Sequence, residues 1–287
     1  MNSLKGLISS ASKKLIDSDS PRLDAELIWA QVLGRDRTWL FTWPDYQPNA
    51  EEILESQHLI SRRTEGEPIA YILSRREFWG LSLECDSSTL IPRPETELLV
   101  EKALNLDLHE SARVLDLGTG NGAIALALAV ERPNWNICAV ELSDPAIELA
   151  QRNAQNLNIS SVDWLQGSWF EPIAEKAQFD LIISNPPYVE ENSSWLEEGD
   201  VRFEPRTALT AGVDGMQDIE LIAKLSQGYL ANGGYILIEH GFNQFEKVFS
   251  ELVKLGYQSV QGFKDLAGLD RAVLARASCY LASRPPA

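Results

Sequence analysis

Four residues near the middle of the chain carry groups that could hold a primary amide or amine. Asn185, Pro186, Pro187 and Tyr188 directly follow the apolar run 179–184, which has the composition of a buried strand. Because prolines carry no backbone N–H and have a fixed φ, the carbonyl oxygens of Asn185 and Pro186 are left free to accept hydrogen bonds. Asn185 adds a side-chain acceptor and Tyr188 a flat ring. We predict that all four residues bind the substrate and that Asn185, Pro186 and Tyr188 take part in catalysis.

Two acceptors beside an aromatic ring suit a planar NH₂ group on an sp² carbon. Such a nitrogen is a poor nucleophile, because its lone pair is delocalised. Acceptors on both N–H bonds would localise the lone pair and hold it in line with an electrophilic carbon. The sulfonium methyl of S-adenosyl-L-methionine is a suitable electrophile and needs no metal, whereas hydride transfer has no use for this clamp. The motif therefore favours methyl transfer, with S-adenosyl-L-homocysteine as the product.

A glycine-rich loop lies between the predicted strand 113–117 and a predicted helix. Its residues are Gly118, Thr119, Gly120, Asn121 and Gly122. Glycines at such a bend allow positive φ and let a ligand approach the backbone. Glu141 ends the next predicted strand, where a carboxylate can accept hydrogen bonds from both hydroxyls of a ribose. The loop predicts a nucleoside cofactor, but with Ala123 it also matches the dinucleotide fingerprint, so by itself it leaves NAD and S-adenosyl-L-methionine open.

Short β-rich runs alternate with helical segments from residue 113 onward. The predicted strands are 113–117, 136–141, 162–166, 179–184, 235–239, 258–263 and 271–275, and the predicted helices between them are 123–131, 145–156, 216–230 and 243–255. This alternation predicts an α/β domain with a mostly parallel seven-stranded sheet covered on both faces. The last two strands have no helix between them, so they should form a terminal antiparallel hairpin.

The chain before this α/β region has a different texture. Residues 1–75 have apolar residues at helical spacing and predict a small helical bundle. Residues 76–96 predict a hairpin followed by a stiff proline-rich connector, since Pro92 and Pro94 hold that stretch extended. The third predicted domain, residues 97–287, begins with an amphipathic helix and contains the sheet.

Composition excludes several classes of protein. The 42 acidic residues outnumber the 25 basic ones and give a formal net charge of −17, which disfavours an intrinsic grip on nucleic acid. The three cysteines form no C-x-x-C pair and the three histidines are isolated, so we expect no metal site. The longest apolar run, 123–130, is far shorter than the roughly 18 residues that span a bilayer. We expect a cytoplasmic protein that makes no membrane contact.

With these features in place, the sequence resembles the release-factor glutamine methyltransferases (HemK/PrmC type) of the S-adenosyl-L-methionine-dependent methyltransferases. The resemblance covers nearly the whole chain. It rests on residues 24–27, 66–71, 76–79, 91–97, 116–120, 167–169, 185–188 and 270–271. It implies a Rossmann-like methyltransferase fold, preceded by a helical domain that docks the protein substrate.

The resemblance also implies a substrate and a division of roles. The family methylates the side-chain amide nitrogen of the glutamine in the Gly-Gly-Gln motif of peptide-chain release factors. Carried over, the loop 118–122 and Glu141 would hold the cofactor, Trp169 would lie along its adenine, and Asn185 would contact both cofactor and substrate. We expect a monomer. Two alternatives are an adenine amino methyltransferase acting on DNA or RNA, which the net charge disfavours, and a non-catalytic cofactor-binding module, which the intact motif 185–188 disfavours.

Overall fold

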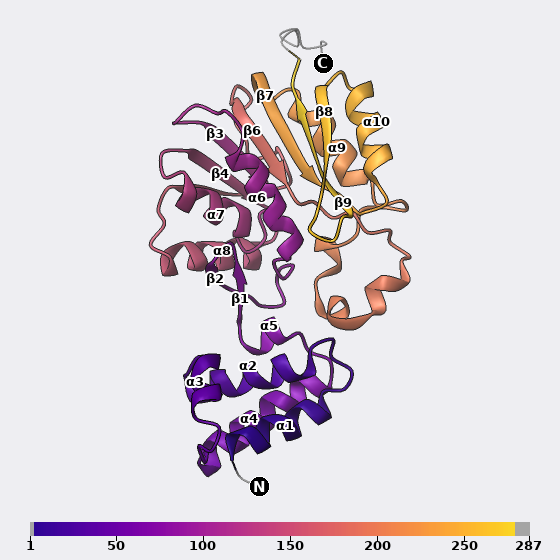
Figure 1. The fold of residues 1–287 in the computed structure, drawn as a ribbon. Helices are drawn as coiled ribbons and strands as arrows, with labels where there is room; N and C mark the ends of the chain where they lie inside the picture. Colours follow the sequence, from indigo (N-terminus) through magenta and orange to yellow (C-terminus); the bar gives the residue numbers. More distant parts are fainter. Residues whose placement is uncertain (1–2, 279–287) are drawn as a thin grey trace. The chain divides into compact units, whose positions relative to one another are not determined.

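The structure, a computed structural model, describes residues 3–278 (Figure 1). The chain divides into two compact units. One unit contains the residues up to Arg75 together with Ser194–Phe203, and the other contains Arg76–Ser193 together with the residues from Glu204 onward. A ten-residue stretch downstream of the Asn-Pro-Pro-Tyr motif is thus grouped with the N-terminal helices, which local sequence patterns did not indicate.

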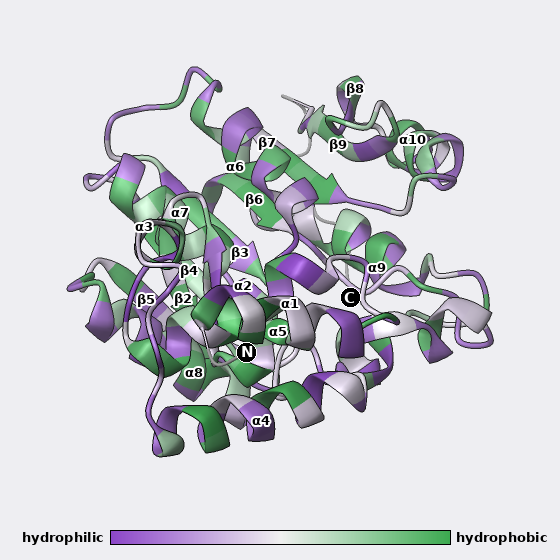
Figure 2. Cartoon of the chain, turned by 60° about the horizontal axis from the view of Figure 1, so that its bottom comes forward, coloured by the Kyte–Doolittle hydropathy of each residue, from purple (hydrophilic) through white to green (hydrophobic). Residues whose placement is uncertain are grey.

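The first unit is helical, as the spacing of its apolar residues predicted. Its helices are α1 (Leu4–Lys14), α2 (Pro21–Leu33), α3 (Arg37–Thr42), α4 (Ala50–Thr64) and α5 (Ile69–Ile72). The two short helices α3 and α5 were not predicted. α4 begins at a capping box in which Asn49 and Glu52 satisfy each other's backbone N–H groups. Hydrophobic and hydrophilic residues alternate along α4 at helical spacing (Figure 2), and its apolar side packs into a core around Trp29, which is 1 % exposed.

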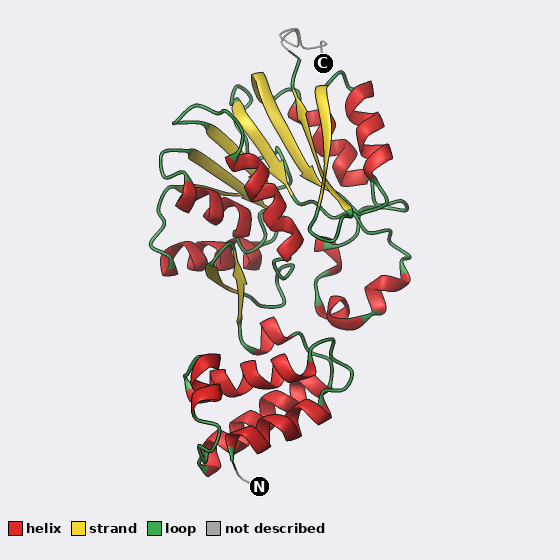
Figure 3. Cartoon of the chain, viewed as in Figure 1, coloured by secondary structure: helices red, strands yellow, loops and turns green. Residues whose placement is uncertain are grey.

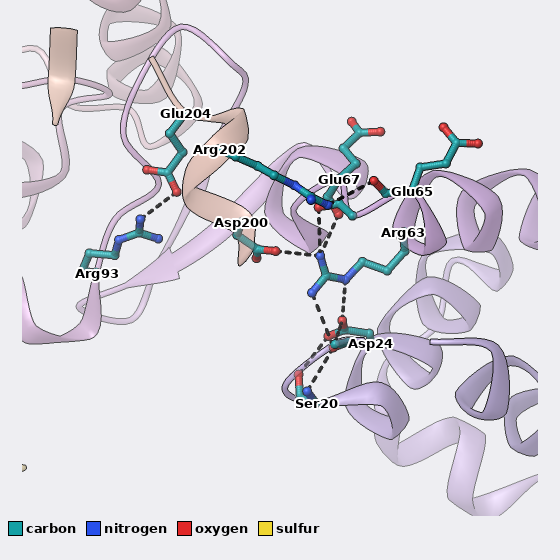
Figure 4. A network of polar contacts seen from close by, with 11 residues as sticks. Ser20, Asp24, Arg63, Glu65, Glu67, Arg93, Asp200, Arg202 and Glu204 are labelled. Atoms are coloured by element: carbon teal, nitrogen blue, oxygen red, sulfur yellow. Dashed lines mark hydrogen bonds and ion pairs between the residues drawn. The ribbon is translucent and has the colours of Figure 1, made fainter. Parts of the chain in front are cut away.

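A buried ion pair joins the helices of this unit to its downstream segment. The guanidinium of Arg63 in α4 bonds to Asp24 in α2 through Nε at 2.7 Å and to Asp200 through Nη1 at 2.7 Å (Figure 4). The side chains of Arg63 and Asp24 are 9 % and 2 % exposed. The hydroxyls of Ser18 and Ser20 donate to the same Asp24 carboxylate. Arg63 therefore supplies the positive charge for a carboxylate that water does not reach.

We expect Arg63→Met to lower the opening free energy of this unit by about 3–5 kcal/mol, the usual cost of leaving one partner of a buried pair uncompensated. Native-state hydrogen exchange of the α2 and α4 amides in the intact protein measures this quantity. Arg22→Met is the matched control, because that arginine is 76 % exposed, and it should change stability by at most about 1 kcal/mol. Equal protection in the two variants would contradict the assignment.

The second unit is built on a seven-stranded sheet with helices on both faces (Figure 3). The strand order is β5-β4-β3-β6-β7-β9-β8; β9 pairs antiparallel with both β7 and β8, and the other neighbours are parallel. This confirms the predicted fold class. The strands are β3 (Arg113–Leu117), β4 (Asn136–Glu141), β5 (Val162–Gln166), β6 (Phe179–Ser184), β7 (Leu230–Glu239), β8 (Gln258–Lys264) and β9 (Asp270–Arg276). The helices are α6 (Glu97–Leu104), α7 (Ala123–Glu131), α8 (Asp144–Asn156), α9 (Gln217–Ser226) and α10 (Phe245–Lys254).

Ahead of the sheet, the predicted hairpin is present as β1 (Arg75–Phe78) and β2 (Leu81–Glu84). The proline-rich connector then leads into the short 3₁₀ helix η1 (Pro94–Thr96), which runs directly into α6. Three further 3₁₀ turns, η2 (Ser194–Glu197), η3 (Gly199–Phe203) and η4 (Arg206–Ala208), follow β6.

Each central strand sends alternate side chains to opposite faces of the sheet. On β6, Leu181 and Ile183 enter the core shared with α6 and α7, whereas Ile182 enters the core shared with α9 and α10. All three side chains are fully buried. Burial on both faces requires an unbroken apolar run, which is why the sequence predicted this strand with its observed bounds.

The chain direction of the sheet determines where a ligand can bind. From β3 the chain proceeds outward to β4 and β5, and from β6 it proceeds in the opposite direction to β7. The switch point therefore lies between β3 and β6, which are parallel neighbours with Leu117 beside Ser184. In open α/β sheets, ligands bind beyond the carboxyl ends of the strands at such a point. The glycine-rich loop and the Asn-Pro-Pro-Tyr motif both begin there.

Candidate active site

The loop after β3 is shaped by its glycines. Gly118 and Gly120 have φ of +69° and +58°, in the left-handed region that disfavours other residues. A Cβ on Gly118 would lie 3.2 Å from the ring of Trp169. A Cβ on Gly120 would meet only Thr89, at 4.0 Å. The first glycine therefore admits an aromatic ring, and the second leaves backbone open to a ligand.

Glu141, the last residue of β4, is fixed by two backbone N–H groups. Gly120 donates to its Oε2 at 2.9 Å, and Ser143 donates to its Oε1 at 3.0 Å. Each carboxylate oxygen keeps further lone pairs, because an ionised carboxylate can accept about four hydrogen bonds. The half-buried carboxylate is thus held in place with acceptor capacity remaining for vicinal hydroxyls.

Beneath the loop lies a fully buried acid, Asp116 in β3. Its Oδ2 accepts a hydrogen bond from the Thr119 hydroxyl at 2.6 Å, and no side chain among the described residues donates to its Oδ1. Burial raises the pKa of Asp116 to about 7, although the Thr119 hydroxyl and the Ala125 N–H stabilise its charged form. This residue was not among the predicted site residues.

The raised pKa of Asp116 predicts a pH-dependent loss of stability. Its ordinary pKa is 3.8, so between about pH 4 and pH 7 the unfolded chain releases this proton while the folded protein retains it. The contribution to the free energy of unfolding is thus complete below pH 4 and is lost as the pH rises through 7. Asp116→Asn cannot titrate, so its stability relative to wild type should increase over that range. Urea unfolding of both proteins across this range measures the difference, and parallel pH profiles would contradict it.

Asn121 and Trp169 take different positions around the glycine-rich loop. The side-chain nitrogen of Asn121 donates to the Glu84 carbonyl at 3.1 Å, so this residue fastens the loop to β2. Trp169 lies against Gly118, and a side-chain hydrogen bond with the tryptophan stabilises the charged form of Asp218, whose pKa burial raises. The indole is therefore held at its edge with the ring beside the loop backbone.

The Asn-Pro-Pro-Tyr motif leaves β6 at the switch point. Just before it, the Ser184 hydroxyl donates to the Leu117 carbonyl at 2.7 Å and ties the ends of β6 and β3 together. The side-chain nitrogen of Asn185 donates to the hydroxyl of Thr96 at 3.1 Å, which leaves the carboxamide oxygen on the other side. Outside the sheet ladders, no hydrogen bond among residues 3–278 ends on the carbonyl of Asn185 or Pro186.

Tyr188 is held in place by hydrogen bonds of its side chain and its backbone. Its hydroxyl donates to Glu239 Oε1 at 3.1 Å, and its carbonyl accepts from the side chain of Gln244 at 3.0 Å. Its backbone N–H donates to the Leu209 carbonyl at 3.1 Å. The carbonyl and hydroxyl contacts hold the last residue of the motif to β7 and to the turn that follows it.

These groups surround a cavity of about 420 Å³, within the range of small-molecule sites. Of the residues predicted from the sequence, the lining contains Gly118, Thr119, Gly120, Asn121, Glu141, Trp169, Asn185 and Pro187. Gly122, Pro186 and Tyr188 do not line it. The structure thus brings the glycine-rich loop, the acid that ends β4 and the asparagine that follows β6 to one cavity.

Several residues of the cavity wall were not singled out from the sequence. They are Phe78, Thr89, Arg93, Thr96 and Asp218. Arg93 is held by an ion pair of 2.7 Å to Glu204, whose side chain is fully buried (Figure 4). Arg93 and Thr96 lie in the stretch 91–97 that carried the family resemblance, and this was the available signal for them.

Within residues 3–278, no group of three or more histidine, cysteine, aspartate or glutamate side chains could hold a metal ion. Within the same residues, no helix is long and apolar enough to cross a bilayer.

Comparison with known proteins agrees with the observed fold. Residues 6–73 match the family described as the PrmC N-terminal domain, and residues 94–198 match the methyltransferase small domain. A crystal structure of a methyltransferase from Pyrococcus furiosus shares the fold with a TM-score of 0.54 and 19% identity, over 76% of this chain and 97% of that one. The family match and the curated relatives described next define the class as the S-adenosyl-L-methionine-dependent methyltransferases.

Curated relatives narrow the class further. The release factor glutamine methyltransferase of Shewanella oneidensis is 47% identical over 259 residues, which cover 90% of each chain. The release factor glutamine methyltransferase of Escherichia coli is 46% identical over 266 residues, covering 93% of this chain and 96% of its own length. The chain belongs to the release factor glutamine methyltransferase family.

The residues present fit the cofactor of this class. The backbone at Gly120 is open to a ligand, the Glu141 carboxylate has acceptor capacity for a ribose, and the Trp169 ring stands beside the loop for an adenine. S-adenosyl-L-methionine, when bound, supplies an electrophilic methyl group on a positively charged sulfur.

Proposed function

We propose that this protein methylates the side-chain amide nitrogen of the glutamine in the Gly-Gly-Gln motif of peptide-chain release factors. S-adenosyl-L-methionine is the methyl donor, and S-adenosyl-L-homocysteine is the product. One observation carries the proposal: Asn185, with its amide nitrogen already bonded to Thr96, lines the same cavity as the glycine-rich loop and Glu141. The free oxygen is thus available to an N–H donor beside the cofactor site.

The acceptors of the motif prepare the substrate nitrogen for attack. In this mechanism, the two N–H groups of the glutamine amide donate hydrogen bonds to the Asn185 side-chain oxygen, in the cavity wall, and to the carbonyl of Pro186, which is the next residue and lies outside that wall. This localises the nitrogen lone pair and aligns it with the methyl group. Pro187 forms part of the cavity wall that contacts the glutamine. The ring of Tyr188 lies outside the lining and packs behind this wall. Positioning of this kind can supply about 7–11 kcal/mol of the barrier reduction.

Proton release follows the transfer. An amide nitrogen becomes acidic as a fourth bond forms on it, so no strong base is required beforehand. The proton can leave through the oxygen of Asn185, through the carbonyl of Pro186 or through water. The role of the chain is therefore to orient and desolvate the amide rather than to abstract a proton first.

The division of labour along the chain is part of the same proposal. Residues 1–75 dock the release factor, residues 76–96 connect, and residues 97–287 carry out methyl transfer. Two large side chains of α3 and its end support docking on the helical unit, because Phe41 and Trp43 are 55% and 57% exposed. We place the protein in the cytoplasm, where translation factors act, as a monomer that requires neither nucleic acid nor a membrane.

A transfer assay with labelled S-adenosyl-L-methionine tests the proposal. The protein is incubated with a release factor, with the same factor carrying a replaced loop glutamine, and with DNA and RNA. Label should appear on the unaltered release factor alone. Label on nucleic acid would instead support an adenine amino methyltransferase, and label on neither would support a non-catalytic module.

A further inference from the structure

One positively charged side chain belongs to the wall of the cavity. Among the described residues that line it, Arg93 is the only lysine, arginine or histidine. Its Nη2 donates to Glu204 Oε1 at 2.7 Å, and the Glu204 side chain is fully buried (Figure 4). The Arg93 side chain itself is 27% exposed. A buried carboxylate therefore holds a guanidinium that solvent or a ligand can still reach.

The guanidinium of Arg93 keeps most of its capacity to donate. An arginine side chain has five N–H donors in a planar fork, and within residues 3–278 the fork of Arg93 makes one hydrogen bond, to Glu204. Arg63 of the same chain bonds the carboxylates of Asp24 and Asp200 at once, each at 2.7 Å. Arg93 with Glu204 forms half of such an arrangement, so it can bond a second carboxylate.

The glycine-rich loop has little capacity left for an anion. Loops before a helix commonly bind anions through their backbone N–H groups. In residues 118–122, four of the five backbone N–H groups donate within the protein instead. Those of Gly118 and Thr119 donate to the Val140 carbonyl, that of Gly120 to the Glu141 carboxylate, and that of Gly122 to the Thr119 carbonyl. An anionic group of a ligand in this cavity therefore depends mainly on a side chain.

We propose that Arg93 bonds Glu204 and the carboxylate at the amino-acid end of S-adenosyl-L-methionine at the same time. This end of the cofactor carries one carboxylate, and the cavity wall offers one cation for it. Other groups are available to the nucleoside, namely Glu141 for the ribose and Trp169 for the adenine. Because the sulfonium lies between the nucleoside and the amino-acid end, binding at both ends restrains the methyl group. The inference concerns the methyl donor and does not depend on which acceptor receives the methyl group.

Calorimetric titration of the intact protein with two ligands tests this assignment. The ligands are S-adenosyl-L-homocysteine and its decarboxylated analogue, which lacks only the carboxylate. Wild type should bind S-adenosyl-L-homocysteine about 10- to 100-fold more tightly, the usual effect of a hydrogen bond to a charged group. Arg93→Met combined with Glu204→Gln removes both charges, so that no buried charge is left unpaired. This double variant should bind the two ligands equally, with the affinity of wild type for the analogue.

Three single variants accompany the double variant. Glu204→Gln keeps the arginine and an acceptor oxygen for it, so the preference for the carboxylate should remain. Arg93→Lys keeps a positive charge beside Glu204, but its ammonium has no planar fork and should retain only part of the preference. Arg113→Met is the matched control, because it removes a positive charge at the start of β3, outside the cavity, and should change neither affinity.

Each contrary result has a definite meaning. Equal affinity of wild type for the two ligands would overturn the inference, because the carboxylate would then have no binding partner. An undiminished preference in the double variant would also overturn it, since another group would bind the carboxylate. If the double variant bound neither ligand, an undiminished preference in Arg93→Lys would overturn the inference in its place. All these results are affinities for the donor, so a failure to methylate a release factor would count against the proposed function alone.

Discussion

Asn185→Ala should lower the single-turnover rate of methyl transfer by about 10²–10³, the usual loss when one preorganised polar partner of a reacting group is removed. The physical reason is that the variant retains only the Pro186 carbonyl to accept hydrogen bonds from the two N–H groups of the substrate amide. Affinity for the cofactor should fall much less, since Glu141 and the glycine-rich loop remain. Rapid-quench measurement of transfer, compared with calorimetric titration of the cofactor, separates the two effects.

Asn134→Ala provides the matched control for that variant. Its side chain is exposed and bonds to Glu110 outside the cavity, so both the rate and the affinity should match wild type. Near-wild-type turnover of Asn185→Ala would refute the clamp, and an equal loss in rate and cofactor affinity would assign Asn185 to cofactor binding alone.

The second large effect is expected on cofactor affinity. Glu141→Ala removes a charged acceptor, and a hydrogen bond to such a group contributes about 1.5–3 kcal/mol. Affinity for S-adenosyl-L-methionine should therefore weaken by about 10- to 100-fold. Glu141→Gln keeps one acceptor oxygen and should give a smaller loss. Isothermal titration calorimetry with S-adenosyl-L-homocysteine measures the affinity without turnover.

Glu148→Ala is the control for the loss of one negative charge, because Glu148 lies in α8, the helix that follows Glu141. Glu148 is exposed on α8 and does not line the cavity, so its removal should leave affinity unchanged. If Glu141→Ala bound the cofactor as tightly as this control, the carboxylate would have no role in holding the ribose.

The sequence predicted best those elements whose pattern depends on burial within the sheet. The predicted and observed bounds of β3, β4, β5 and β6 agree. For β3, β4 and β6, which have strands on both sides, the reason is that a strand inside the sheet needs a largely apolar run that ends where a turn or ligand-binding residue begins. The predicted start of β7 at Tyr235 was wrong, because the strand begins at Leu230. The prediction started too late because Asn232, Gly233 and Gly234 are residues typical of a turn. That early part is instead paired through Leu230 with Phe179, with a register shift before Leu181.

The site was only partly accessible from local pattern. The glycine-rich loop and Asn185 each follow a strand, and Glu141 is the last residue of one. Because the carboxyl ends of parallel strands meet at one edge of the sheet, their convergence could be predicted. Thr96 and Glu239 could not be placed, because their link to Asn185 and Tyr188 joins residues far apart in the chain. Likewise, Asp200 meets Arg63 across 137 positions, a pairing that no short window of sequence contains.

In the proposed reaction, this cavity presents a glutamine side-chain amide to a methyl donor. Its most direct test is fragmentation mass spectrometry of a release factor after incubation with the protein and isotopically labelled S-adenosyl-L-methionine. We expect one labelled methyl group on the side-chain nitrogen of the Gly-Gly-Gln glutamine, and none in a reaction with Asn185→Ala stopped at the same early time. A labelled methyl group on any other residue, or an unmodified glutamine after prolonged incubation with wild type, would contradict it.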